Sequence, residues 1–182
     1  ASLDIFFEAL ALICKNLAAE KEREINVYLP GYFCSQSLRF LRSLPIKLHF
    51  YLLNEELLPD YSKIIDSKTN HSIDVFIHVH YFGQIAGQKR SRDFSNKIGA
   101  ILIEDCAHII SPYIVRSWKG DFLIFSPHKH FPVPKIGLVI ARRKFIIKKN
   151  FCNKSFPSLW VLKEVLKKAR LVIPQPKWGQ IW

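Results

Sequence analysis

Short apolar runs alternate with helical segments along this chain, and this alternation most constrains its fold. The runs have the length of strands, and the segments between most of them carry apolar residues at helical spacing. We expect strands at residues 25–29, 46–53, 72–79, 100–103, 122–125 and 137–141. We expect helices at residues 3–21, 34–44, 59–65, 88–97 and 159–171. Strands that alternate with helices predict an α/β domain with a mostly parallel sheet.

The length of 182 residues is enough for one domain with a real core. The composition is 49% hydrophobic and includes 14 Phe, which favours a globular chain over a disordered one. The chain contains no methionine, and it opens at Ala1, next to Ser2 as the N-cap of the first expected helix. We therefore expect a piece of a longer protein, or a shortened copy of one.

The net charge of +12, from 27 Lys+Arg against 15 Asp+Glu, raises the question of an anionic partner. A nucleic-acid-binding surface and an ordinary solvated basic surface both fit this number. The basic residues are scattered, with only short runs such as 142–144 and 167–168, and no nucleic-acid motif accompanies them. The pattern favours a solvated surface without a nucleic-acid partner, and such a surface also attracts a charged cofactor or substrate.

The four cysteines, Cys14, Cys34, Cys106 and Cys152, lie far apart and form no C-x-x-C pair. This spacing argues against a zinc site and for a reducing, cytoplasmic setting, so we expect no metal. No apolar run approaches the roughly 18 residues of a membrane helix, and no signal-peptide pattern is present. We therefore expect no membrane span.

Polar and aromatic clusters follow four of the expected strands. They occupy residues 30–32, 80–83, 105–108 and 126–129. Ligands of open parallel sheets bind beyond the carboxyl ends of the strands, so these clusters are expected to meet at one edge. The chain has no G-x-G-x-x-G or Walker loop, so nothing local indicates a dinucleotide or nucleoside-triphosphate site.

Lys129 lies in a proline-rich turn directly after the apolar run 122–125. A desolvated lysine is a nucleophile towards carbonyl groups and forms Schiff bases. The alternative is a solvated surface charge, which is what most lysines are. Asp105, at the end of an earlier strand, has its own alternative as a helix cap.

Pyridoxal phosphate requires a particular set of partners, and this chain offers several of them. The cofactor needs a lysine, a carboxylate against its pyridinium nitrogen, hydroxyl and backbone donors for its phosphate, and a flat side chain over its ring. Lys129, Asp105, Ser126 and several aromatic residues stand in suitable positions.

Four stretches resemble the DegT/DnrJ-type (StrS-like) sugar aminotransferases among the fold-type-I pyridoxal phosphate enzymes. They are VYLPGY at 27–32, IHVHYFGQ at 77–84, IEDCAH at 103–108 and GDFLIFSPHK at 120–129. Each is weak alone, but the E-D-x-A-H and S-x-x-K elements together, each following an apolar strand, are fairly specific. The resemblance runs from about residue 3 to about residue 142. It implies the three-layer α/β/α architecture of the large domain of these enzymes.

The resemblance also implies roles for single residues. Lys129 would form the Schiff base and then move the proton between the substrate α-carbon and the cofactor. Asp105 would pair with the pyridine nitrogen. Ser126 would bind the phosphate, or it is simply a turn serine before Pro127.

Three further residues match less specific positions of the family pattern. His108 would lie near the ring hydroxyl, with a structural histidine as the alternative. Tyr32 and Phe33 fall in the segment that supplies the ring-stacking residue, and they are otherwise core aromatics. His80 and Tyr81 match a loop near the site.

The family members are longer, with a glycine-containing turn at the beginning and a small domain at the end. We therefore expect a pyridoxal-phosphate-binding large domain at residues 1–150, and in 151–182 a helix and tail that are the remnant of, or connection to, the small domain. Because these enzymes place their sites at dimer interfaces, a homodimer is expected.

The implied function is transfer of an amino group from an amino acid to a nucleotide-linked keto-sugar. The alternative is a catalytically incomplete remnant or partner module of the same fold. Dehydration on the same cofactor also remains open, although the family's dehydratases replace the lysine by histidine and Lys129 is present here.

Overall fold

The computed structural model describes residues 5–35, 38, 41–66, 72–110, 118–131 and 137–142. In this part of the chain, six strands form one sheet in the order β2-β1-β3-β4-β5-β6. The strands are β1 (Ile25–Pro30), β2 (Ile46–Tyr51), β3 (Val75–Val79), β4 (Ile101–Cys106), β5 (Phe122–Phe125) and β6 (Leu138–Ala141). Strands β1 to β5 pair in parallel, and only β6 pairs antiparallel, with β5.

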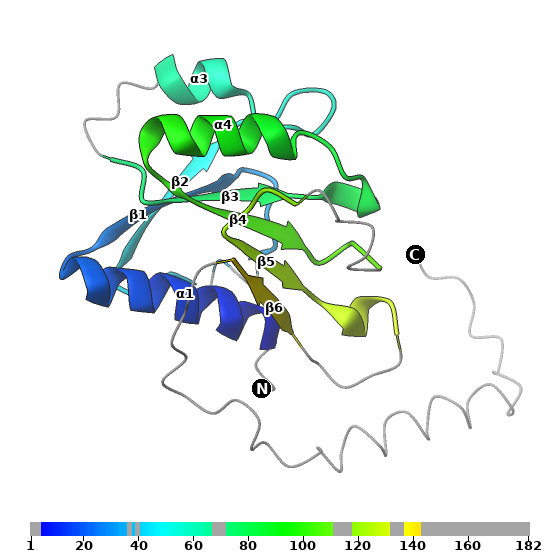
Figure 1. The fold of residues 1–182 in the computed structure, drawn as a ribbon, viewed down its shortest axis with the longest axis horizontal. Helices are drawn as coiled ribbons and strands as arrows, with labels where there is room; N and C mark the ends of the chain where they lie inside the picture. The colour runs from blue at the N-terminus through cyan, green and yellow to red at the C-terminus, as the bar shows by residue number, and fades with distance from the viewer. Residues whose placement is uncertain are drawn as a thin grey trace, which may run out of the picture.

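Helices cover both faces of the sheet (Figure 1). Helix α1 (Ile5–Lys21) lies on one face, and helices α3 (Tyr61–Asp66) and α4 (Gln88–Ile98) lie on the other. Two single 3-10 turns, η1 (Tyr81–Gly83) and η3 (Pro127–Lys129), follow β3 and β5. The expected three-layer α/β/α fold with a mostly parallel sheet is confirmed.

The central strands are buried on both faces, which explains why they read as continuous apolar runs. In β3 every residue is buried. Val75 and Ile77 share one core cluster with Leu10 of α1. Phe76 points to the opposite face, where its ring lies 5.1 Å from that of Phe94 in α4. Side chains that alternate between two apolar layers hold the sheet between the helices.

Strand β4 is longer than the sequence indicated. The apolar pattern predicted an end at Ile103, whereas the strand continues to Cys106 and includes Glu104 and Asp105. The reason is pairing with β3, since Val79 lies opposite Asp105 and the N–H of His80 donates to the Asp105 carbonyl at 3.0 Å. Backbone pairing thus carries two carboxylates into the sheet.

Several expectations fall on residues outside the described part of the chain. The helix at 159–171 and the C-terminal segment 151–182 lie there entirely, and the helix at 34–44 lies there in part. Cys14, Cys34 and Cys106 are free thiols in the described part. No helix among the described residues is long and apolar enough to cross a membrane.

A buried carboxylate, Asp74, ties helix α1 to the amino-terminal edge of the sheet. Asp74 is only 2% exposed, and it accepts hydrogen bonds from Lys21, from Arg23 at 2.7 and 3.0 Å, and from the backbone N–H of Asn26 at 2.8 Å. Burial alone would raise the pKa of Asp74, but these bonds hold it below its ordinary value. The carboxylate is therefore ionised at neutral pH and stabilises the fold.

Replacing Asp74→Asn is expected to lower the free energy of unfolding by about 2 kcal/mol at pH 7, because a charge-assisted network is broken. The Asp74 contribution is complete above the ordinary aspartate pKa of about 3.9, and it is lost as the pH falls through the lowered pKa of the folded chain. Urea unfolding between pH 7 and pH 2 measures this. Glu24→Gln, which breaks the exposed pair with Lys47, is the control and should cost less than about 0.5 kcal/mol. Equal losses in the two variants would contradict the assignment.

Candidate functional site

Four parallel strands deliver the polar clusters to one edge of the sheet. Because β1, β3, β4 and β5 are parallel neighbours, their carboxyl ends lie side by side. The first residues after these strands are Gly31, His80, Ala107 and Ser126, so Pro30, Asp105 and Cys106 of the expected clusters lie at the ends of the strands themselves. The structure therefore brings the predicted site residues to a single edge, as the sequence indicated.

Asp105 is the buried acid of this edge. It is 8% exposed, and its Oδ1 atom accepts a hydrogen bond from the backbone N–H of Ala107 at 2.9 Å. Burial raises the pKa of Asp105 to about 6, while the Ala107 bond and the charges of Lys129 and His80 act in the opposite direction. The carboxylate is thus ionised at neutral pH, which lowers the stability of the fold. A cation beside it would stabilise its charge.

Lys129 lies at the end of turn η3 and is exposed. Its backbone N–H donates to the Ser126 carbonyl at 3.0 Å, which closes the turn. The next residue, His130, reaches the Ala107 carbonyl through Nε2 at 3.2 Å, so the lysine turn packs against the turn that follows Asp105. The Lys129 charge lowers the pKa of both Asp105 and His108.

His108 is held by the backbone of a strained residue. Phe82 has a φ of 52°, a left-handed conformation that is uncommon for a residue other than glycine, and its N–H donates to His108 Nδ1 at 3.2 Å. The two rings also stack, with centroids 6.0 Å apart. Burial lowers the pKa of His108, as do the charges of Lys129 and His130. The ring is therefore neutral with its proton on Nε2, and it offers one N–H donor.

Ser126 is 1% exposed, and its hydroxyl lies 3.1 Å from His128 Nδ1. The hydroxyl thus already bonds within its own turn. Tyr32 is 63% exposed and stacks on Tyr81 at 5.5 Å, and the Tyr81 hydroxyl donates to the Tyr32 carbonyl. Phe33 packs against the core on the α1 side, so of the two candidates Tyr32 has the more accessible ring.

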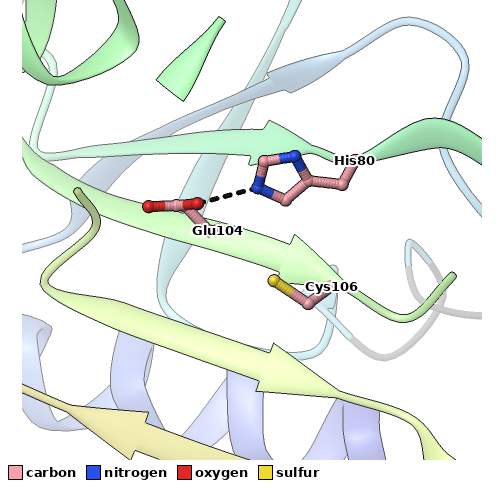
Figure 2. Close-up of side chains that lie close together, drawn as sticks. All are labelled: His80, Glu104 and Cys106. Atoms are coloured by element: carbon pink, nitrogen blue, oxygen red, sulfur yellow. Dashed lines mark hydrogen bonds and ion pairs between the residues drawn. The ribbon is translucent and has the colours of Figure 1, made fainter. Parts of the chain in front are cut away.

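The sequence did not reveal a buried cluster on the other face of β4. Figure 2 shows His80, from the end of β3, reaching Glu104 of β4, with Cys106 on the same face. His80 Nε2 lies 2.7 Å from Glu104 Oε2, and Glu104 Oε1 accepts the backbone N–H groups of Lys119 at 2.7 Å and Gly120 at 2.5 Å. Glu104 and Cys106 are two residues apart in the sequence, and residues with this spacing share a face in a strand. The sequence pattern ended the strand at Ile103, so this signal was missed.

This cluster has residue types that also occur in metal sites. One ligand atom from each of His80, Glu104 and Cys106 lies within 4.8 Å of the others. Both oxygens of Glu104 already accept hydrogen bonds, and burial raises the pKa of Cys106 far above its ordinary value. His80 and Glu104 thus form a hydrogen-bonded pair in the core, with Cys106 beside them.

No family model matches the sequence. A curated serine hydroxymethyltransferase from Alcanivorax borkumensis is 27% identical over 116 residues, which are 60% of this chain and 28% of that protein. The chain thus spans less than a third of that relative.

Solved structures of aminotransferases share the fold. PseC from Helicobacter pylori, an aminotransferase involved in the biosynthesis of pseudoaminic acid, aligns with a TM-score of 0.61 at 15% identity, over 91% of this chain and 52% of that chain. A DegT DnrJ EryC1 StrS aminotransferase from Brucella abortus aligns with a TM-score of 0.53 at 13% identity, over 67% of this chain and 36% of that chain. This chain therefore has the fold of the large domain of fold-type-I pyridoxal phosphate transferases, and structural neighbours include the family that its motifs resemble.

Replacing Asp105→Asn is expected to stabilise the chain at neutral pH. The raised pKa of about 6 means that the folded chain binds more protons than the unfolded chain between about pH 4 and pH 6. Stability therefore falls as the pH rises through this window. Asparagine can keep the acceptor for the Ala107 N–H but carries no charge, so the gain at pH 7 should be on the order of 2 kcal/mol.

Urea unfolding of both proteins from pH 4 to pH 7 tests this prediction. The Asp74→Asn variant is the matched comparison, because its carboxylate has a lowered pKa and its loss should destabilise. A wild-type chain without the falling slope, or an Asp105→Asn variant that is less stable at pH 7, would contradict the burial of an ionised Asp105.

Proposed function

We propose that this chain is the cofactor-binding domain of a pyridoxal 5'-phosphate-dependent aminotransferase. Its reaction moves an amino group from an amino acid to a nucleotide-linked keto-sugar, in the biosynthesis of cell-surface polysaccharide or of a secondary metabolite. The observation that carries the proposal is a buried, ionised Asp105 in β4 and Lys129 in the turn after the neighbouring β5, both at the carboxyl edge of this particular fold.

The residues at this edge fit the cofactor. Asp105 is ionised above a pH of about 6, as the partner of a pyridinium nitrogen must be, and its Oδ2 atom has no hydrogen-bond partner among the described residues. His108 offers an N–H at Nε2 for the ring hydroxyl. Ser126 offers a hydroxyl for the phosphate once it turns from His128, and Tyr32 offers an exposed ring for stacking.

When bound, pyridoxal phosphate supplies an electron-accepting ring for the negative charge that forms at the substrate α-carbon. Lys129 would hold the cofactor through its amine, and the same amine, once released, would take and return the proton at the substrate α-carbon. Asp105 would hold the ring nitrogen and, as an opposite charge, would favour its protonated form. The bond of His130 to the Ala107 carbonyl packs the lysine turn against the turn that follows Asp105.

The charge at the edge supports an anionic substrate. Lys129 is an exposed cation at this edge, and the whole chain carries +12. Positive charge attracts the phosphates of a nucleotide-linked sugar and the carboxylates of an amino-acid donor. We place the protein in the cytoplasm, as a homodimer whose partner completes the site.

Removing the lysine amine with Lys129→Ala should abolish the covalent adduct with pyridoxal phosphate. The wild-type chain is expected to develop an absorbance band with the cofactor, and borohydride should then fix the cofactor on Lys129 in peptide mass spectra. Lys47→Ala, which removes an exposed lysine of β2, should retain the band.

A Lys129→Ala chain that forms the same adduct would overturn the assignment. An adduct on Lys129 without consumption of an amino-acid donor would instead identify the chain as a non-catalytic module of the same fold. Loss of adduct formation in Asp105→Asn, despite its greater stability, would assign the carboxylate to the cofactor and not to the fold.

A further inference from the structure

One buried carboxylate connects segments that lead into different parts of the candidate site. Glu104 accepts a hydrogen bond from His80, which ends β3, and two from the backbone of residues 119–120, which lead into β5. The side chains of both Glu104 and His80 are fully buried, and Figure 2 shows them meeting between β3 and β4. The carboxylate therefore joins three neighbouring strands at one point.

Each of these strands carries a part of the site a few residues further on. Glu104 directly precedes Asp105 in β4, and the backbone of His80 binds the Asp105 carbonyl at 3.0 Å. Gly120 precedes β5, which ends at Ser126 and the turn of Lys129. The position of β5 against β4 sets how far the lysine lies from Asp105.

We propose that the His80–Glu104 pair is a positioning element, which holds the strand of Lys129 against the strand of Asp105. This role rests on the function proposed above. Glu104 points away from Asp105, since adjacent residues of a strand face opposite sides of the sheet. The pair acts through the backbone segments that it binds.

Gly120 shows how tightly the segment is held. A Cβ atom at this position would lie 3.0 Å from Glu104 Cγ, 3.1 Å from Glu104 Oε1 and 2.9 Å from the Phe122 carbonyl oxygen. Only glycine allows the backbone to approach the carboxylate this closely. The close contact between Gly120 and Glu104 thus requires a glycine just before β5.

The Glu104 carboxylate is ionised at neutral pH. Burial would raise the pKa of Glu104, but the bonds from His80 and from the two backbone N–H groups hold it below its ordinary value. Hydrogen bonds to an ionised acceptor are stronger than neutral ones. At neutral pH the carboxylate therefore holds all three donors at once.

Gly120→Ala and Gly99→Ala form a matched pair of variants that tests this role. Alanine at position 120 pushes the segment away from Glu104 without changing any charge. Gly99 lies between α4 and β4 with a φ of 69°, and an added Cβ would meet no atom within 4 Å, so its replacement strains the backbone away from the site. Both variants should lose stability, but only Gly120→Ala should lose adduct formation at Lys129, by about tenfold or more.

A second readout needs no cofactor. Carbon-detected NMR of the Asp105 carboxyl gives its pKa with and without Lys129→Ala, and the difference is the contribution of the lysine charge. This difference should be clear in the wild type and in Gly99→Ala, and strongly reduced in Gly120→Ala and in Glu104→Gln. Glu104→Gln keeps an acceptor for the backbone donors and serves if Gly120→Ala does not fold.

An unchanged Lys129 contribution in Gly120→Ala and Glu104→Gln would overturn the positioning role. So would equal effects of Gly120→Ala and Gly99→Ala on both readouts. Absence of any Lys129 adduct in the wild type would count against the proposed aminotransferase function alone, because the Asp105 titration still decides whether the pair positions the lysine.

Discussion

Parallel pairing of β3, β4 and β5 is the constraint on which the rest of the structure depends. Parallel strands end at the same edge, so residues far apart in the sequence meet there. The same pairing buries these strands on both faces, which leaves polar side chains only two arrangements. They lie at strand ends, or they are fully bonded inside, as Glu104 is.

Two adjacent carboxylates show that the face of a strand on which a side chain lies determines its hydrogen-bond partners and its pKa. Glu104 meets an imidazole and two backbone N–H groups, and its pKa falls. Asp105, one residue later, points to the opposite face, accepts one backbone bond, and its pKa rises to about 6. The first is suited to holding the fold together, and the second to holding a cationic ligand.

Much of the fold and part of the candidate site could be predicted from the sequence, because they depend on patterns within short stretches of residues. Apolar runs and turn residues identified the strands, and the rule for parallel sheets identified the edge to which Asp105, His108, Ser126 and Lys129 belong. Glu104 was misplaced beyond its strand because an apolar pattern cannot show that a buried acid has found partners. The contact of Phe82 with His108, and the stack of Tyr32 on Tyr81, depend on strand order, which no local signal encodes.

The reversal of β6 has a consequence for how the start of β5 is held. Because β6 runs against β5, Arg142 lies beside Asp121, at the end of the sheet remote from Lys129. Asp121 also accepts a hydrogen bond from Arg92 of α4 at 2.9 Å, so the start of β5 is held by both β6 and α4. The turn that carries Lys129 lies at the other end of β5, remote from both contacts.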